Sequence, residues 1–150
     1  EVIKELKLEG IETIHGRAED YGKNKKYREQ FDISTSRAVA KLTTLTEYCI
    51  PFVKTGGSFI PFKSGDVTEE IVSAKKAIEI LGGALVDVKR FHLPTTDIER
   101  ALIRIDKKST TPMKYPRAAV NQGKSLWCSI MLNNESLDEI VNFFIIFYGN

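Results

Sequence analysis

His15 to Arg37 reads H-G-R-A-E-D-Y-G-K-N-K-K-Y-R-E-Q-F-D-I-S-T-S-R and contains the carboxyl ends of two expected strands. One strand runs into Ala18-Glu19, and the other runs into Ser36-Arg37. In an open α/β sheet, ligands bind just beyond the carboxyl ends of the strands. We therefore expect the two loops of this stretch to bring an acid and an arginine to one crevice.

The rest of the chain alternates between helical and strand patterns. Helices are predicted over residues 1–8, 38–49 and 68–81, the last with Asp66 or Thr68 as its cap. Strands are predicted over residues 11–15, 31–36, 58–62, 84–93 and 101–105, with a loop or short helix over 16–30 and a turn over 54–57. Because no helix separates the last two strands, the pattern predicts an α/β fold whose mostly parallel sheet ends in an antiparallel strand pair.

The composition is that of one globular domain. The chain has 150 residues, of which 42% are hydrophobic and 28% are charged, and this length can bury a core. Its net charge of +2 is too small to predict a polyanionic partner. Two basic clusters, within residues 23–28 and 107–117, fit either solvated surface or contact with a nucleic acid.

The two cysteines, Cys49 and Cys128, form no C-x-x-C motif and predict free thiols in a reducing compartment. His15 and His92 lie far from both in the sequence, so no metal site is expected. The first residues resemble an amphipathic helix rather than a signal peptide. The apolar run over residues 140–148 is shorter than the about 20 residues that a membrane-spanning helix needs, so no membrane association is expected.

Three side chains at strand ends are candidates for ligand binding. Glu19, beside Asp20, can accept hydrogen bonds from a nucleoside, or the backbone there can contact an adenine edge; the alternative is a solvated loop acid. Arg37 presents a planar fork of donors that suits a carboxylate or a phosphate; the alternative is an arginine paired with a nearby acid. Lys63 suits a phosphate contact or an ordinary turn.

The segment Thr111–Arg117, T-P-M-K-Y-P-R, is unlike a core element. Two prolines stiffen it, and Lys114 and Arg117 flank the aromatic ring of Tyr115. Base stacking combined with phosphate pairing is a common way of holding RNA. The alternative is a disordered, solvated tail.

Six motifs in this order resemble one known family. They are H-G-R-A-E-D, Y-R-E-Q-F-D, S-R-A-V-A, C-I-P-F-V-K-T-G-G, A-K-K-A-I-E-I-L-G-G and T-P-M-K-Y-P-R, which together cover about residues 1–126. The chain resembles the guanine-N7 methyltransferases of small-subunit ribosomal RNA, the RsmG or glucose-inhibited division protein B family. The resemblance implies a Rossmann-like class I methyltransferase fold, with strand order 3-2-1-4-5-7-6, and a cytoplasmic enzyme.

The resemblance also implies the reaction and its residues. A methyl group would pass from S-adenosyl-L-methionine to N7 of one guanine in 16S ribosomal RNA, on the small ribosomal subunit. Ala18 and Glu19 match the loop that contacts the adenosine of the cofactor, and Arg37 matches the arginine of the S-R-A motif in the cofactor site. Lys114, Tyr115 and Arg117 would face the RNA.

No catalytic residue is expected. Guanine N7 has a free lone pair and no proton to remove, so alignment of the reactants and exclusion of water are sufficient. This agrees with the residues, because Ser34, Ser36 and Cys49 have no histidine at a recognisable spacing.

The chain departs from the family pattern at its start. Residues 1–8 match the helix after the second strand, so the glycine-rich loop and the first two strands are expected to be missing, as in an incomplete gene model. In the family strand order this leaves 11–15 without a neighbour and exposes an edge of 31–36. We expect the third strand to slide beside the fourth, or the amino-terminal region to fray. We also expect weak cofactor binding by this chain alone.

The chain also departs from the family at its end. We divide it into a partial methyltransferase domain (1–106), a basic RNA-facing tail (107–126) and an atypical extension (127–150). A capping box at Ser136–Glu139 favours a short apolar helix over 140–148, although the run Phe143–Phe147 is equally a β-aggregating segment. The expected protein is a monomer. Two rivals to an active enzyme are a non-enzymatic RNA-binding remnant and a half-domain that needs an amino-terminal complement.

Overall fold

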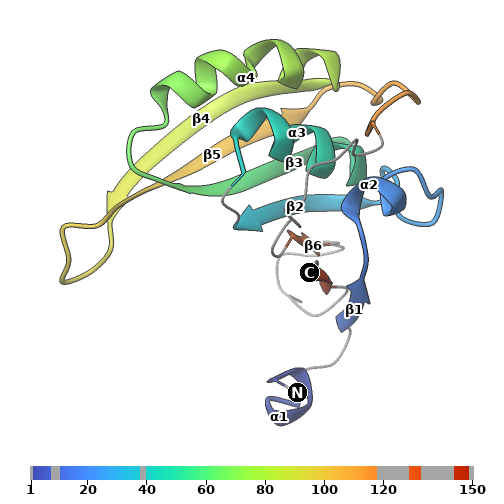
Figure 1. Ribbon diagram of the computed structural model, residues 1–150, viewed down its shortest axis with the longest axis horizontal. Helices are drawn as coiled ribbons and strands as arrows, with labels where there is room; N and C mark the ends of the chain where they lie inside the picture. The colour runs from blue at the N-terminus through green and yellow to red at the C-terminus, as the bar shows by residue number, and fades with distance from the viewer. Residues whose placement is uncertain (1, 8–10, 38–39, 118–128, 133–143, 149–150) are drawn as a thin grey trace.

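The structure is a computed structural model that describes residues 2–7, 11–37, 40–117, 129–132 and 144–148. Within these residues, one mixed sheet of seven strands has the order β1-β7-β6-β2-β3-β5-β4. Helices α3 (Leu42–Cys49) and α4 (Thr68–Ile80) lie along one face of this sheet (Figure 1). The short helix α1 (Val2–Glu5) lies apart from them, at the amino-terminal end.

The half of the sheet farthest from β1 follows the predicted pattern. Strand β2 (Phe31–Arg37) is parallel to β3 (Val53–Ser64), which is antiparallel to β5 (Glu99–Lys107). The edge strand β4 (Gly83–His92) is antiparallel to β5, so the expected antiparallel pair is confirmed. Across the whole sheet, however, the pairings β2–β6, β3–β5, β4–β5 and β6–β7 are all antiparallel. The expectation of a mostly parallel sheet is therefore wrong.

The predicted turn over residues 54–57 is also wrong, because β3 runs through it. The register with β2 shifts there, from Phe31 opposite Val53 to Ile33 opposite Ser58. Gly56 has a φ of 92°, and a Cβ on Gly57 would lie 2.3 Å from the carbonyl oxygen of Asp32. The two glycines thus form an irregularity inside a strand, where Gly56 supplies a positive φ and a side chain on Gly57 would collide with the neighbouring backbone.

The main core lies between the sheet and the two long helices. It contains the apolar side of α3 and α4 and the inward residues of the central strands, including Leu42, Leu45, Phe59, Ile78 and Ile103. Helix α4 begins at Thr68 as predicted, with Asp66 Oδ1 accepting a hydrogen bond from its backbone N–H at 2.9 Å.

Helix α3 begins at Leu42 rather than near residue 38, and the cap comes from another helix. The backbone N–H of Leu42 donates to Oε2 of Glu70, on α4, at 2.9 Å. The Lys63 ammonium contacts the same oxygen at 2.8 Å and donates to the carbonyl oxygen of Ala40 at 2.9 Å. Lys63 is thus a buried link between β3 and the two helices rather than an open phosphate contact.

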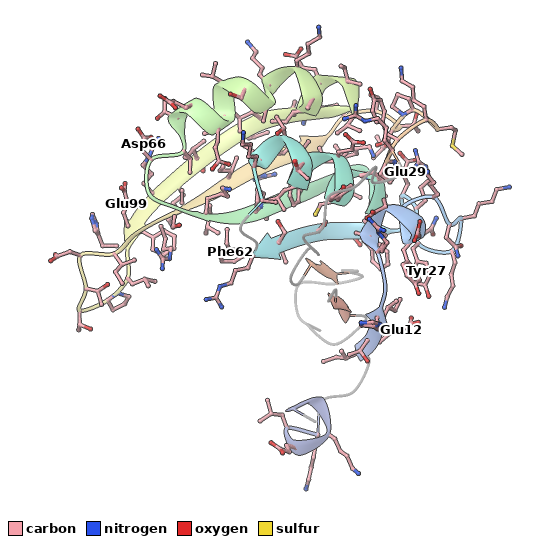
Figure 2. All side chains as sticks on the ribbon, viewed as in Figure 1. Glu12, Tyr27, Glu29, Phe62, Asp66 and Glu99 are labelled. Carbon is pink, nitrogen blue, oxygen red and sulfur yellow. The ribbon has the colours of Figure 1, made fainter. Side chains whose placement is uncertain are left out.

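A smaller core holds the amino-terminal strand. Strand β1 (Ile11–His15) is confirmed, and it leads into the short helix α2 (Ala18–Tyr21). Ile14 packs in one cluster with Ala18, Tyr27 and Phe31, joined by Phe52 from the 3₁₀ turn Ile50–Phe52. Tyr27 also donates from its hydroxyl to Glu12 Oε1 at 3.2 Å, and Figure 2 shows these two side chains near each other beside β1.

The carboxyl-terminal extension contributes two strands to the middle of the sheet. Strand β6 (Ser129–Leu132) is antiparallel to β2, and β7 (Phe144–Tyr148) is parallel to β1. The favoured apolar helix is therefore wrong for Phe144–Tyr148, whose backbone is a strand; residues 133–143 lie outside the described part. Strand β1 also neither slides beside β2 nor frays, since β7 and β6 lie between them (Figure 1). Backbone pairing has overridden the local capping signal.

Candidate functional site

Helix α2 places the two candidate adenosine-contacting residues in buried positions. Ala18 is 4% exposed and its side chain belongs to the cluster around Ile14 and Phe31. Glu19 is 5% exposed, and its Oε1 accepts a hydrogen bond from Nε of Arg17 at 2.9 Å. Glu19 is therefore a paired, buried acid rather than a solvated one, and the carbonyl oxygen of Ala18 accepts a hydrogen bond from the backbone N–H of Gly22 at 2.7 Å.

Arg37 lies at the carboxyl end of β2, whereas α2 lies beside the amino-terminal end of that strand (Figure 1). The described residues therefore do not bring Arg37 and Glu19 to one crevice. Three strand steps separate β1 from β2, and sheets twist by about 20 to 25° per step, so the loops beyond these strands diverge. The roles predicted for Ala18, Glu19 and Arg37 stay predictions.

Two serines next to Arg37 are further candidates that the sequence pattern did not single out for binding. Ser34 and Ser36 are buried on β2, and their hydroxyls have no hydrogen-bond partner among the described residues. A buried hydroxyl without a partner costs about 1 to 3 kcal/mol. The alternation S-T-S could have revealed them, because it points both hydroxyls to one face of the strand.

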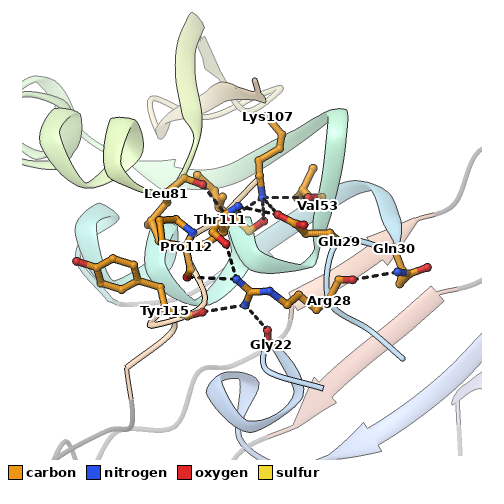
Figure 3. A network of polar contacts seen from close by, with 11 residues as sticks. Gly22, Arg28, Glu29, Gln30, Val53, Leu81, Lys107, Thr111, Pro112 and Tyr115 are labelled. Carbon is orange, nitrogen blue, oxygen red and sulfur yellow. Dashed lines mark hydrogen bonds and ion pairs between the residues drawn. The ribbon is translucent and has the colours of Figure 1, made fainter. Parts of the chain in front are cut away.

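Arg28 belongs to the first basic cluster of the sequence but is a buried structural residue. Its Nη1 donates to the carbonyl oxygens of Gly22 and Tyr115, each at 2.8 Å. Its Nη2 donates to the carbonyl oxygens of Thr111 at 2.7 Å and Pro112 at 3.3 Å (Figure 3). One guanidinium therefore fastens the end of α2 to the segment Thr111–Arg117.

A partly buried ion pair lies beside Arg28. The Lys107 ammonium contacts Oε1 of Glu29 at 3.0 Å and donates to Oγ1 of Thr111 at 2.6 Å. Burial lowers the pKa of Lys107 below its ordinary value, and the Glu29 carboxylate opposes this shift. The same Glu29 oxygen accepts a hydrogen bond from the backbone N–H of Thr111 at 2.7 Å, although Glu29 adopts a positive φ of 54°. These contacts hold the residue in a backbone conformation that costs about 1 kcal/mol.

The candidate RNA-facing residues lie on this fastened segment, so the alternative of a disordered tail is wrong for Thr111–Arg117. The Lys114 ammonium and the Arg117 guanidinium lie 5.4 and 5.7 Å from the ring centre of Tyr115. Arg117 also forms a two-pronged ion pair with Glu47 of α3, with Nη2 to Oε2 at 2.6 Å and Nε to Oε1 at 2.9 Å. The guanidinium is thus already paired, whereas Lys114 is exposed.

The Glu47 pair shifts the pKa values of its surroundings. Burial raises the pKa of Glu47, but the hydrogen bonds from Arg117 outweigh burial and hold it below its ordinary value. Burial raises the pKa of Tyr48, and the carboxylates of Glu19 and Glu47 raise it further. Glu19 and Glu47 therefore belong to one electrostatic neighbourhood, which connects α2 with the Thr111–Arg117 segment.

Sequence reasoning missed Arg28 and Glu47, which organise this neighbourhood. Arg28 stands in a run of surface lysines, and nothing in its spacing separates it from them. Glu47 lies on the polar side of a predicted helix, and its partner Arg117 is 70 residues away. Contacts at such separations have no local signal in a single sequence.

Within the described part of the chain, no helix has the length and apolar character needed to cross a membrane. The same residues contain no group of three or more histidine, cysteine or carboxylate side chains that could hold a metal ion.

The family model and the curated relatives that match this chain indicate the same family. The sequence model of the family described as rRNA small subunit methyltransferase G, GidB, matches residues 1–103. The chain is similar to three curated proteins that bear the name ribosomal RNA small subunit methyltransferase G. It is 52% identical over 125 residues to that of Acetivibrio thermocellus (83% of this chain, 51% of the relative). It is 53% identical over 118 residues to that of Lachnoclostridium phytofermentans (79% of this chain, 49% of the relative). It is 50% identical over 119 residues to that of Clostridium tetani (79% of this chain, 50% of the relative).

The chain thus spans about half the length of the curated relatives it matches. Its mixed α/β sheet is consistent with the expected Rossmann-like methyltransferase fold. The family model covers more than half of the chain, including β1, β2 and β3. The chain belongs to the rRNA small subunit methyltransferase G family.

Proposed function

We propose that this chain forms part of an enzyme that transfers a methyl group from S-adenosyl-L-methionine to N7 of a guanine in 16S ribosomal RNA. The observation that carries the proposal is the family match over residues 1–103, together with identities near 50% to proteins named for this class of activity. In this proposal the protein is a cytoplasmic monomer whose partner is the small ribosomal subunit.

Arg28 supports the proposal through geometry. Its Nη1 joins the carbonyl oxygens of Gly22, at the end of α2, and Tyr115. A Cβ on Gly22 would lie 3.1 Å from Cγ of Pro116, so the two segments are also in close contact. A helix proposed to contact adenosine and a segment proposed to contact RNA are therefore fastened together.

The chemistry requires positioning more than proton transfer. The cofactor, when bound, supplies an activated methyl group, and guanine N7 supplies a lone pair. The chain's own contribution would be the backbone of Ala18, the carboxylate of Glu19 and the guanidinium of Arg37. Because α2 and Arg37 lie at opposite ends of β2, these residues do not enclose a cofactor by themselves. We expect the chain alone to bind the cofactor weakly.

Calorimetric titration of S-adenosyl-L-methionine into the folded chain tests that expectation. A dissociation constant of low micromolar or tighter would contradict it. Methyl transfer to 16S ribosomal RNA is then measured for the chain alone and for the chain mixed with the half of the Acetivibrio relative that it does not match. Arg37→Met should lower transfer about tenfold or more, as expected for a lost charge-assisted hydrogen bond. Arg104→Met, which removes an exposed arginine on β5, is the matched control. A folded mixture without any transfer would refute the proposed activity.

A second candidate is a non-enzymatic RNA-binding module, favoured by the two cations around Tyr115. It predicts RNA binding that weakens steeply with salt, without any cofactor affinity. Tyr115→Ala should then weaken binding by about 1 to 3 kcal/mol, the usual effect of losing one stacked base. Cofactor-dependent methyl transfer would exclude this candidate.

A further inference from the structure

The edge strand β4 presents a long line of backbone groups to solvent. Its ten residues, Gly83–His92, pair on one side with β5, and within the described residues no strand pairs with the other side. Figure 1 shows β4 beneath α4, and the strand order places it at the border of the sheet opposite β1. An unpaired strand edge offers N–H and C=O groups to which another strand can add.

The backbone groups of Val88 point outward from this edge. The N–H of Leu93 donates across the hairpin to the carbonyl oxygen of Ile98 at 3.0 Å, and inward and outward groups alternate along an antiparallel strand. The groups of Val88, five residues before Leu93, therefore face away from β5. Its N–H donates to Oδ1 of Asp87 at 2.8 Å. An outward donor of β4 is thus satisfied by a side chain of its own strand.

The charges of β4 suit antiparallel pairing with a second copy of this chain in one register. About a twofold axis through Val88, Asp87 of each copy lies directly opposite Lys89 of the other. Asp87 and Lys89 are both exposed and, being two residues apart, lie on one face of the sheet. Because Val88 would form a hydrogen-bonded pair with its own copy, the flanking positions form non-hydrogen-bonded pairs, whose side chains are closer. Registers centred on Asp87 or Lys89 would instead place like charges opposite each other at the axis.

Helix α4 adds an apolar side chain beside this part of β4. Nη2 of Arg90 donates to Oγ1 of Thr68 at 3.3 Å, so the first turn of α4 flanks the strand. Val72, one turn further, lies on the same side of the helix as Thr68 and is 73% exposed. Val86, at the irregularity of β4, is 51% exposed. The edge therefore combines complementary charges with exposed apolar side chains, as protein–protein interfaces do.

We infer that β4 is a self-association edge, at which two copies of this chain join their sheets through residues 86–90 about an axis at Val88. Each Val88 N–H would donate to the carbonyl oxygen of the other Val88, and each released Asp87 carboxylate would pair with Lys89 of the other copy. A twofold pairing closes on itself, so it gives a dimer and not a fibre.

This interface is small, and small interfaces are weak, so the monomer dominates in dilute solution. The monomer of the proposed function is then the dilute form of the chain. The inference goes beyond that function, because pairing of β4 needs neither cofactor nor RNA.

Sedimentation velocity of the full chain, at concentrations up to about 1 mM, measures the dimer at the weak end of association. We expect the wild type to shift towards dimer as its concentration rises. Lys89→Asp creates two like-charge pairs and should raise the dissociation constant at least tenfold. Lys25→Asp is the matched control, because Lys25 is exposed in the loop before β2, three strand steps from β4. A wild type that stays monomeric, or a Lys89→Asp chain that dimerises like the wild type, would overturn the inference.

Mixing two variants tests the register itself. Asp87→Lys also creates like-charge pairs at both contacts, so this chain alone should dimerise as poorly as Lys89→Asp. In an equimolar mixture, position 87 of each chain faces an opposite charge at position 89 of the other, so a heterodimer should form about as tightly as the wild-type dimer. Circular dichroism checks that each variant is folded. A mixture of folded chains that stays monomeric would overturn the inference.

Hydrogen exchange of the wild-type chain gives a readout that does not depend on a variant folding. Protection of Val88 and Arg90, whose N–H groups share the outward direction, should rise with protein concentration. Protection that is independent of concentration would overturn the inference. Because these measurements involve neither cofactor nor RNA, their failure is distinguishable from failure of the proposed function.

Discussion

Replacing Arg28 with Met should destabilise the protein far more than an ordinary surface substitution. Arg28 is 7% exposed, and its guanidinium donates to four carbonyl oxygens; the bonds to Gly22 and Thr111 are buried. A hydrogen bond from a charged donor contributes about 1.5 to 3 kcal/mol to stability. When the donor is removed and the buried acceptor finds no other, most of that contribution is lost. The two buried bonds therefore account for about 4 kcal/mol, whereas the part-buried carbonyls of Pro112 and Tyr115 can regain water.

Part of this loss is offset, because Met removes a charge that had to be desolvated. We expect a net decrease of about 3 kcal/mol in the free energy of unfolding, measured by urea denaturation with linear extrapolation. Arg28→Lys keeps the charge but not the fork of donors, so an intermediate loss is expected.

The control for this experiment is Arg104→Met, since Arg104 forms one exposed ion pair with Asp106 and should change stability by less than about 1 kcal/mol. Tryptic cleavage after Lys114 should also become faster in Arg28→Met, because the segment loses its fastening. If Arg28→Met and Arg104→Met proved equally stable, the structural role assigned to Arg28 would be wrong.

Three further substitutions test other parts of the structure. Gly57→Ala drives a methyl group into a backbone carbonyl of β2, and urea denaturation should show a loss of about 2 to 3 kcal/mol; a loss below 1 kcal/mol would mean that the irregularity in β3 is plastic. Glu29→Gln leaves the buried Lys107 ammonium without its carboxylate, and should lose about 3 kcal/mol at neutral pH, the lower end for breaking a buried pair because Glu29 is partly exposed. That deficit should shrink in alkaline solution, where Lys107 becomes neutral, and a pH-independent deficit would argue against the ion pair. The Glu47–Arg117 pair lowers the pKa of the Glu47 carboxyl below its ordinary value of 4.5. Its contribution to stability is therefore fully present above about pH 4.5 and is lost as the pH falls through the lowered pKa of the folded state. Thermal denaturation should therefore show that the small advantage of the wild type over Glu47→Gln disappears in acid, and a constant advantage would exclude the pair as its source.

The elements with strong local patterns could be predicted from sequence. The helix Thr68–Ile80 and the strand pair Gly83–His92 and Glu99–Lys107 follow from apolar periodicity, a cap at Asp66 and a glycine pair between helix and strand. These signals act over a few residues, so a single sequence contains them. The family could also be predicted, since its motifs occur in order.

Elements that depend on distant partners could not be predicted. Gly56 and Gly57 indicate a turn locally, yet the chain continues as one strand because Val53 and Ser58, on either side of them, both pair with β2. The apolar run at Phe144–Tyr148 has a helical start signal nearby, but the open edge of β1 draws it into a strand. The residues of the candidate site could be named from the sequence one by one. Their positions relative to one another could not, because they depend on the twist of a sheet in which β6 and β7, the last described strands of the sequence, lie between β1 and β2.

The position of β7 has a consequence for synthesis on the ribosome. Ile11 pairs with Phe144, so the first strand of the sheet waits for a neighbour that is translated about 130 residues later. At about 5 to 20 residues per second, this interval is roughly 7 to 26 s. During it, the nascent chain has an uncovered strand edge that can recruit a chaperone or another nascent chain. Strand β1 is therefore closed only after residues 144–148 have left the ribosome.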